Sequence, residues 1–269
     1  MSTFQDCTAL ITGASSGIGA ELARQLAPHA RCLLLVARRG ERLAQLRADI
    51  GRPGLTLHCF PTDLADEGDI DALLEKIEAT GETVTLLINN AGLGDHGLFE
   101  EGDWARVKAM LDVNIMALTR LTYALVPRLV AAGRGAILNV SSISGLMPMP
   151  RMAVYGATKA YVTSFSEALK VELKEAGITV TAVCPGPVDT EFLQRASRIP
   201  GLPAESPGPR SRKAGLLNVP VDQVAKEALE AVARDRARVI PGWKLNGIMT
   251  VATLIPASLM RRLRSPVKR

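Results

Sequence analysis

The stretch Thr12-Gly13-Ala14-Ser15-Ser16-Gly17-Ile18-Gly19 sets three glycines between an apolar run and a segment of helical period. The apolar run, Cys7–Thr12, predicts a strand, and the segment Gly17–Ala27 predicts a helix. Glycine suits a tight turn, and the N–H groups at the start of a helix attract anions. The turn is therefore predicted to hold the diphosphate of a nucleotide, although glycines also end strands for structural reasons alone.

The same alternation of short apolar runs and helical segments continues along the chain. Further strands are predicted at Arg31–Ala37, Thr56–Phe60, Val84–Asn89, Gly135–Val140 and Thr179–Cys184. Further helices are predicted at Glu41–Ile50, Glu67–Thr80, Trp104–Ala132 and Val154–Ala176. The pattern predicts an α/β fold, a single doubly wound Rossmann-type domain with a central parallel β-sheet flanked by helices on both faces. Ligands gather at the carboxyl ends of such strands.

Outside the predicted core, at about 7–190, two stretches break this rhythm. Proline and glycine crowd Arg198–Pro220, which predicts a mobile substrate loop at about 190–219. A C-terminal tail at about 242–269 combines an apolar segment with terminal arginines. This tail is too short and too interrupted by Pro256 to span a bilayer, so no transmembrane span is predicted. It could instead touch a membrane peripherally, cover the substrate pocket or mediate a dimer contact.

Composition narrows the class of protein. The formal net charge is +5, but five basic residues lie among the last nine, and aromatic residues make up only 4%, so nucleic acid is not an expected partner. Neither the cysteines nor the histidines His29, His58 and His96 form a ligand motif, and no metal is predicted. Reduced, buried thiols and an N-terminus without a signal pattern predict a cytoplasmic protein. The four cysteines are Cys7, Cys32, Cys59 and Cys184.

The end of the second predicted strand indicates which cofactor binds. NAD-binding proteins usually present a carboxylate there, whereas this chain reads Val36-Ala37-Arg38-Arg39-Gly40. Guanidinium groups at this edge would pair with a 2′-phosphate, so NADP(H) is the expected cofactor, with Ser15 as a further donor; a solvated surface pair is the alternative. Asp63, after the third strand, could accept from the adenine amino group or cap the next helix.

Two later segments carry candidate chemistry. Tyr155-Gly156-Ala157-Thr158-Lys159 opens a helical run, and the i, i+4 spacing puts the phenol and the ammonium on one helix face. A neighbouring cation, together with an oxidised nicotinamide, would bring the pKa of the phenol from about 10 toward neutrality. Ser142 follows the fifth predicted strand and could hold a substrate carbonyl, although serines after strands are often only turn residues.

In their order and spacing these segments resemble the short-chain dehydrogenase/reductase family, over about Thr8 to Thr190. The motifs are TGASSGIG (Thr12–Gly19), NNAG (Asn89–Gly92), Asn114, Ser142, YGATK (Tyr155–Lys159) and Pro185-Gly186. The resemblance implies that Tyr155 is the general acid/base and that Ser142 polarises the carbonyl. It also implies that Lys159 binds the nicotinamide ribose and lowers the pKa of Tyr155, and that Asn114 helps hold a proton-relay water.

The resemblance also implies cofactor contacts along the whole dinucleotide. Those contacts fall at the diphosphate, the adenosine ribose and the nicotinamide, on Gly13, Gly17, Ile18, Gly19, Asn90, Ala91, Gly92, Pro185, Gly186, Val188 and Thr190. The other predicted cofactor contacts are Ser15, Ser16, Arg38, Arg39, Asp63, Leu64, Tyr155 and Lys159.

The expected function is hydride transfer between NADP(H) and a small-molecule carbonyl or secondary alcohol. Methionines and other apolar residues in the variable segments favour a hydrophobic ketone, aldehyde or 3-oxoacyl substrate, unless they only pack the loop. They are Leu146, Met147, Met149, Met152, Phe192 and Leu193. The alternatives are an epimerase or dehydratase on the same scaffold and a non-catalytic NADP-binding regulatory or scaffold protein. Family members assemble through the two long helices, so a homodimer or homotetramer is expected.

Overall fold

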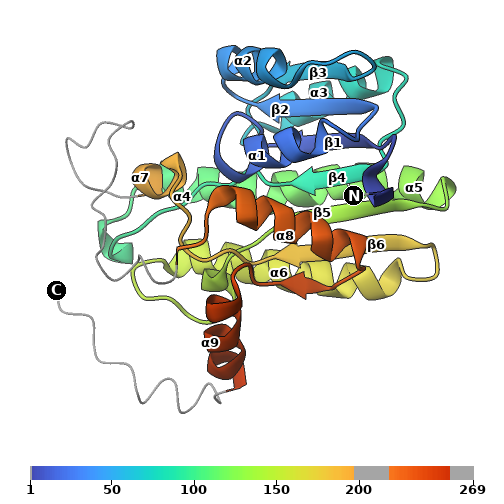
Figure 1. Ribbon diagram of the computed structural model, residues 1–269. Helices are drawn as coiled ribbons and strands as arrows, with labels where there is room; N and C mark the ends of the chain where they lie inside the picture. The colour runs from blue at the N-terminus through green and yellow to red at the C-terminus, as the bar shows by residue number, and fades with distance from the viewer. Residues whose placement is uncertain (1, 197–217, 255–269) are drawn as a thin grey trace.

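A seven-stranded parallel sheet in the order β3-β2-β1-β4-β5-β6-β7 forms the centre of this computed structural model, which describes residues 2–196 and 218–254 (Figure 1). The strands are β1 (Thr8–Thr12), β2 (Cys32–Ala37), β3 (Thr56–Pro61), β4 (Leu86–Asn89), β5 (Gly135–Val140), β6 (Ile178–Val183) and β7 (Arg238–Val239). The predicted doubly wound α/β fold is confirmed. Strand β7 was not predicted, because two residues carry no readable pattern.

Helices cover both faces of the sheet (Figure 1). The helices are α1 (Gly17–Leu26), α2 (Gly40–Ile50), α3 (Glu67–Ala79), α4 (Trp104–Leu111), α5 (Leu118–Ala131), α6 (Ala153–Glu172), α7 (Glu191–Ala196), α8 (Val221–Ala233) and α9 (Trp243–Leu254). A π-helical turn, η3 (Asp112–Ala117), joins α4 to α5, and short 3-10 turns lie at η1 (Ser2–Phe4), η2 (Phe99–Glu101) and η4 (Ile143–Gly145).

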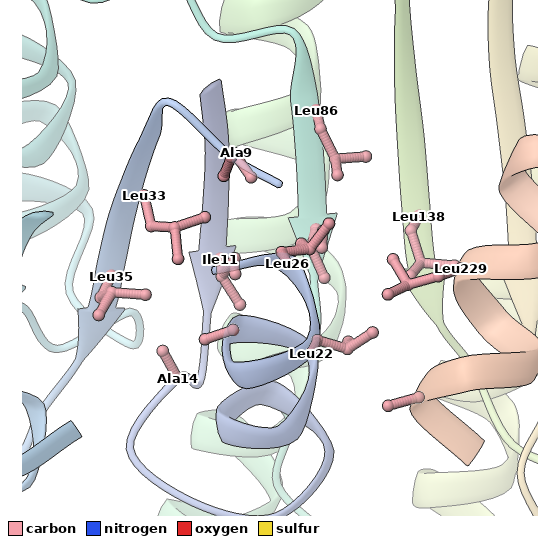
Figure 2. Close-up of a cluster of buried hydrophobic side chains, with 14 of the residues drawn as sticks. Ala9, Ile11, Ala14, Leu22, Leu26, Leu33, Leu35, Leu86, Leu138 and Leu229 are labelled. Atoms are coloured by element: carbon pink, nitrogen blue, oxygen red, sulfur yellow. The ribbon is translucent and has the colours of Figure 1, made fainter. Parts of the chain in front are cut away.

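Alternate side chains of each strand enter one of two apolar layers. Ile11, Leu33 and Leu138 face α1 and α8, which contribute Leu22 and Leu229 to the same cluster (Figure 2). The opposite layer packs under α3, α5 and α6. Because the central strands are buried on both faces, they read as continuous apolar runs. The sheet edge where these strands end is thereby held rigidly.

The continuous helical segment Trp104–Ala131 has the length and hydropathy that a membrane-spanning helix needs. Its buried side chains, among them Val113, Leu121 and Leu125, pack in the apolar layer with side chains of the central strands. A helix that covers the core of a folded domain passes the same test of composition. We therefore assign this segment to the core, as its helical period predicted.

Parts of two predicted segments lie outside the described residues. The predicted mobile loop falls largely within 197–217, and the tail beyond Leu254 is likewise outside the described residues. Within the described part, the chain after Thr190 forms α7, and 243–254 forms α9. Helix α8 was not predicted, although Val221, Val224, Ala225, Ala228 and Leu229 repeat with helical period after Pro220.

Candidate active site

The glycine turn after β1 is tight and lies close to the first turn of α1. Gly13 and Gly17 adopt φ values of +66° and +57°, which side chains rarely tolerate. A β-carbon at Gly19 would lie 2.5 Å from the carbonyl oxygen of Gly13, so the first turn of α1 approaches the loop closely. Asn90, at the end of β4, donates its side-chain amide to the carbonyl oxygen of Thr12 at 2.9 Å. The predicted residues Gly13 to Gly19 and Asn90 are thus brought together.

Arg39, which follows β2, lies beside this turn. Its guanidinium donates to the hydroxyl of Ser15 at 3.3 Å and to that of Ser16 at 3.0 Å. Arg38, by contrast, is exposed. The structure therefore separates the two predicted arginines and places Arg39 at the phosphate turn.

Two charged residues that the sequence analysis missed join Arg39. The carboxylate of Glu191, the first residue of α7, accepts from Arg39 at 3.0 Å and also pairs with Arg42 of α2. Burial opposes ionisation of Glu191, but hydrogen bonds from Arg42 and Arg39 outweigh it and lower the pKa of this carboxyl. In the sequence, Arg42 reads as a surface residue of α2 and Glu191 as an ordinary first-turn acid. Only the fold brings these two residues together.

Asp63 is not the N-cap of the helix that follows it. One carboxylate oxygen of Asp63 accepts from the backbone N–H of Ala65 at 3.1 Å. Asp66 caps α3 instead, through its bond with the N–H of Asp69. The capping alternative for Asp63 is therefore wrong, and its contact with adenine stays a prediction. Leu64, beside it, is buried.

The segment after β6 packs beside the glycine turn and the end of β5. Pro185 accepts from the backbone N–H of Ile143 at 3.0 Å, which ties this segment to the end of β5. Val188 is buried against Ile18 and Val224. Thr190 lies over the glycine turn, since a β-carbon at Gly17 would be 3.3 Å from its methyl group. The predicted nicotinamide residues Val188 and Thr190 thus lie beside predicted diphosphate residues.

Ser142, Tyr155 and Lys159 converge at the end of β5. The hydroxyl of Ser142 hydrogen-bonds with Tyr155 and accepts from the N–H of Ser144 at 3.1 Å. Lys159 lies one turn after Tyr155, and its Nζ is 5.9 Å from the centroid of the phenol ring. A β-carbon at Gly145 would lie 2.4 Å from the carbonyl carbon of Lys159, so a glycine is needed where η4 packs on α6. This contact fixes the serine against the tyrosine.

The pKa of Tyr155 differs from the sequence expectation. Burial raises it to about 12, and the hydrogen bond with Ser142 opposes that rise. Lys159 is fully buried as well, and burial lowers its pKa to about 8, while its Nζ donates to the carbonyl oxygen of Val140 at 2.8 Å. Burial of the phenol is the largest influence on its pKa in this arrangement. The predicted lowering also depends on an oxidised nicotinamide beside the phenol, and it stays a prediction.

Asn114 lies in the π-helical turn between α4 and α5. Its amide donates to the backbone oxygen of Leu93 at 2.9 Å and to the hydroxyl of Thr158 at 2.9 Å, and its oxygen accepts from the N–H of Leu93 at 2.8 Å. A β-carbon at Gly92 would be 3.3 Å from both Asn114 Oδ1 and Lys159 Nζ. Asn114 therefore stands beside the lysine, where π-helical turns often accompany functional sites. Its part in a proton relay stays a prediction.

The buried ammonium of Lys159 predicts a pH-dependent stability. Between pH 8 and 10.5 the unfolded lysine is protonated while the native one is not, so stability rises with pH. Relative to Lys159→Met, the free energy of unfolding of the parent should rise by roughly 2–3 kcal/mol across this window, from the lowered pKa. Urea unfolding of both proteins at pH 7.5 and 10.5 measures it. A constant difference would contradict burial of a titrating lysine.

Helix α7 covers Tyr155 in this conformation. The ring of Phe192 lies 5.6 Å from that of Tyr155, measured between centroids, and Tyr155 is only 6% exposed. The cavity that adjoins Tyr155 has a volume of about 10 Å³, enough for one water molecule. A groove of about 480 Å³ along α8 and β7 is larger, but none of the predicted site residues lines it. Among the described residues, Phe192 therefore covers the phenol ring.

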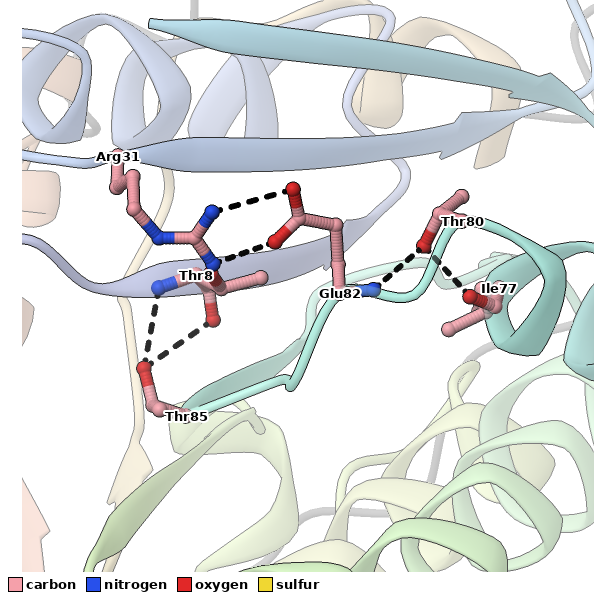
Figure 3. A network of polar contacts seen from close by, with 6 residues as sticks. All are labelled: Thr8, Arg31, Ile77, Thr80, Glu82 and Thr85. Atoms are coloured by element: carbon pink, nitrogen blue, oxygen red, sulfur yellow. Dashed lines mark hydrogen bonds and ion pairs between the residues drawn. The ribbon is translucent and has the colours of Figure 1, made fainter.

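A second polar cluster lies at the opposite end of the strands. Arg31 pairs with Glu82 and donates to the hydroxyl of Thr8 at 2.8 Å (Figure 3). Ligand atoms of Cys32, His58 and Glu82 lie within 4.8 Å of one another, a grouping that the sequence did not predict. Burial raises the pKa of the Cys32 thiol to about 12, and Arg31 already neutralises Glu82. We therefore interpret this cluster as a network of polar contacts that stabilises the fold.

Comparisons with known proteins agree with this geometry. The family model of short chain dehydrogenases matches residues 7–199. Sulfoacetaldehyde reductase 2 of Chromohalobacter salexigens is 37% identical over 185 residues, which cover 68% of this chain and 73% of that reductase.

Two solved structures share the fold over 98% of this chain. One is a short-chain dehydrogenase from Sphingobium yanoikuyae in complex with NADPH, with a TM-score of 0.78, 34% identity and 98% of its own chain covered. The other is the bulky-bulky ketone specific alcohol dehydrogenase from Comamonas testosteroni, with a TM-score of 0.73, 29% identity and 97% of its chain covered. Sequence motifs, sheet order and relatives agree, and the chain belongs to the short-chain dehydrogenase/reductase family.

Proposed function

We propose that this protein is an NADP(H)-dependent oxidoreductase that interconverts a hydrophobic ketone, aldehyde or 3-oxoacyl compound with its alcohol, with Tyr155 as the proton-transfer residue. The observation that carries the proposal is the convergence of Ser142, Tyr155 and Lys159 beside the glycine turn. The NADPH complex of the Sphingobium yanoikuyae relative supports the cofactor, as does the position of Arg39 against Ser15 and Ser16.

The residues of the site divide the chemistry among them. When bound, the nicotinamide supplies or accepts the hydride. Tyr155 gives its phenolic proton to the substrate oxygen as the carbonyl becomes an alcohol, and takes it back in the reverse direction. Ser142 hydrogen-bonds the same oxygen and so favours the charge that develops on it. Lys159 holds the nicotinamide ribose. Together with Asn114, Lys159 also forms the path by which a proton returns to Tyr155.

Cofactor preference is predicted to depend on Arg39. We expect Arg39→Ala to weaken NADPH binding at least about tenfold, because charged hydrogen bonds to the 2′-phosphate are lost, and to leave NADH binding nearly unchanged. Arg38→Ala is the matched control and should have a smaller effect, since Arg38 is exposed. Fluorescence titration of the parent and the two variants gives the six dissociation constants. Equal losses of NADPH and NADH affinity in Arg39→Ala would refute a 2′-phosphate contact.

Apolar side chains around Tyr155 support a hydrophobic substrate. Phe192 lies against the phenol ring, and Val107, Met110 and Val154 line the small cavity beside it. Leu146 and Met147, in contrast, pack against the buried cluster that contains α9 residues, so these two serve packing. Met149 and Met152 are half-buried, and the side chain of Leu193 lies outside the described residues. The relative from Comamonas testosteroni, specific for bulky-bulky ketones, fits this class.

One observation favours a second substrate class. Arg151 lines the cavity beside Tyr155 and adopts a left-handed backbone conformation, with φ of +66°. A guanidinium there would suit a carbonyl compound that carries an acidic group. The 37% identical relative is a reductase of sulfoacetaldehyde, which is such a compound.

NADPH oxidation with a panel of carbonyl compounds tests the proposal. The panel contains bulky aryl ketones, steroid ketones, quinones, 3-oxoacyl thioesters and small anionic aldehydes. We expect the highest kcat/KM with a bulky apolar ketone or thioester. Preference for anionic aldehydes would favour the second class. A non-catalytic regulator would consume no NADPH, and an epimerase would regenerate its cofactor in each cycle.

We also propose that the chain forms a single domain that assembles as a homodimer or homotetramer through α4, α5 and α6. Exposed aromatic and aliphatic side chains on these helices support this: Tyr123 is 74% exposed and Val171 is 74% exposed. The hydroxyl of Tyr161 on α6 bonds with Thr119 on α5 at 2.8 Å, so the two helices present one surface. Light scattering measures the assembly.

Two further proposals concern location. A cytoplasmic protein is supported by four thiols that form no disulfide, of which Cys59 is half-buried and the others are buried. Peripheral contact of the tail with a membrane is supported by α9, where Trp243 is 79% and Leu254 is 77% exposed. The alternatives of a pocket cover and a dimer contact use the same side chains.

A further inference from the structure

The first residue of α7 lies among three guanidinium groups. The carboxylate of Glu191 accepts from Arg39 at 3.0 Å and from Arg195 at 2.9 Å, and it also pairs with Arg42. Its side chain is 27% exposed, so these pairs are partly shielded from water. The contacts reach from the end of β2 and from α2 across to the segment that follows the predicted nicotinamide residues. Glu191 thus links the segment after β6 to Arg39 and Arg42 beside the glycine turn.

The arginine that binds Glu191 is also the arginine of the phosphate turn. Arg39 uses Nη1 for the carboxylate and Nη2 for the hydroxyls of Ser15 and Ser16. A carboxylate and a phosphate monoester are both anions that accept charge-assisted hydrogen bonds from guanidinium groups, so both can use the same donors. A carboxylate and a phosphate bound by the same guanidinium groups repel each other. Each of them also occupies N–H donors that the other would use.

We propose that Glu191 competes with the 2′-phosphate of NADP(H) for Arg39 and Arg42, and so sets how strongly this protein distinguishes NADP(H) from NAD(H). The inference rests on the proposed function, because it assumes that the dinucleotide binds across the glycine turn. NADP(H) must displace a carboxylate that NAD(H) leaves in place. The preference for NADP(H) over NAD(H) is therefore smaller than Arg39 and Arg42 would give in the absence of Glu191.

Glu191→Gln tests the competition, because it keeps the shape of the side chain and removes the charge. Dissociation constants of NADPH and NADH are measured by fluorescence titration for the parent, Glu191→Gln and Glu41→Gln. Glu41 is exposed and precedes Arg42 in the first turn of α2, so its variant changes the net charge equally. We expect Glu191→Gln to bind NADPH about tenfold more tightly than the parent, with NADH affinity within about twofold.

The other outcomes are distinct. A parallel loss of NADPH and NADH affinity in Glu191→Gln would mean that Glu191 fastens α7 over the whole dinucleotide, which overturns the competition. An equal gain in NADPH affinity in Glu41→Gln would show that the change in net charge causes the effect. This outcome would also overturn the competition. If the parent prefers NADPH while Glu191→Gln changes nothing, this inference alone fails. If the parent binds neither dinucleotide, the proposed function fails with it.

Discussion

Replacing Tyr155 by phenylalanine is expected to lower kcat about a thousandfold, because the only phenolic proton at the substrate oxygen is lost. The residue is only 6% exposed, and its ring contacts with Phe192 remain in the variant, so the fold of the site should persist. The Kd for NADPH should stay within about threefold of the parent, because the hydroxyl is the only group removed. Steady-state kinetics on a responsive carbonyl compound and fluorescence titration measure the two quantities.

The same helix offers a matched control. Tyr161 is 36% exposed, and its hydroxyl bonds with Thr119 rather than with the site. Tyr161→Phe removes the same atom from α6 and should leave kcat within about twofold of the parent. Reduction by Tyr155→Phe at near-parent rates would show that another group donates the proton.

Replacing Ser142 by alanine has the second largest expected effect, a fall in kcat of about a hundredfold. The hydroxyl of Ser142 hydrogen-bonds with Tyr155, so it lies where the oxygen of a carbonyl would meet both groups. Its loss removes a donor that acts on the charge developing in the transition state. Some stability should be lost as well, because the buried hydroxyl also accepts from the N–H of Ser144. Steady-state kinetics and urea unfolding separate the two effects.

The neighbouring serine should behave in the opposite way. The hydroxyl of Ser141 donates to the carbonyl oxygen of Lys159 at 2.8 Å and bonds with Thr163 at 2.7 Å. Ser141→Ala is therefore expected to cost about 1–2 kcal/mol of stability and to retain most of the activity. If the activity of Ser142→Ala fell only in proportion to its loss of stability, Ser142 would be a turn residue and not a residue that acts on the substrate.

The parts of the fold that were predicted correctly are those that local sequence controls. The glycines of Thr12–Gly19 mark the turn, and the uninterrupted apolar runs of β1, β2 and β4 mark strands buried on both faces. The i, i+4 spacing of Tyr155 and Lys159 gave their shared helix face without any tertiary information. Such features depend on neighbours in the chain, which the sequence displays directly.

The parts that were missed depend on distant residues. Arg42 and Glu191 are 149 positions apart, and the sequence near each residue does not indicate that they form an ion pair. The raised pKa of Tyr155 follows from burial by Phe192 and the surrounding chain, which no local pattern reports. Likewise, Cys32, His58 and Glu82 meet only because β2 and β3 are neighbours in the sheet.

Transfer of deuterium from NADPH that carries deuterium at both C4 positions to a carbonyl compound tests the central claim most directly. With a substrate that responds in the oxidation assay, we expect one deuterium on the carbinol carbon for each NADPH consumed, as mass spectrometry of the alcohol would show. The same label should appear at a rate about a thousandfold lower with Tyr155→Phe. Alcohol without deuterium, or binding of NADPH without consumption by any carbonyl compound, would contradict an oxidoreductase built on this site.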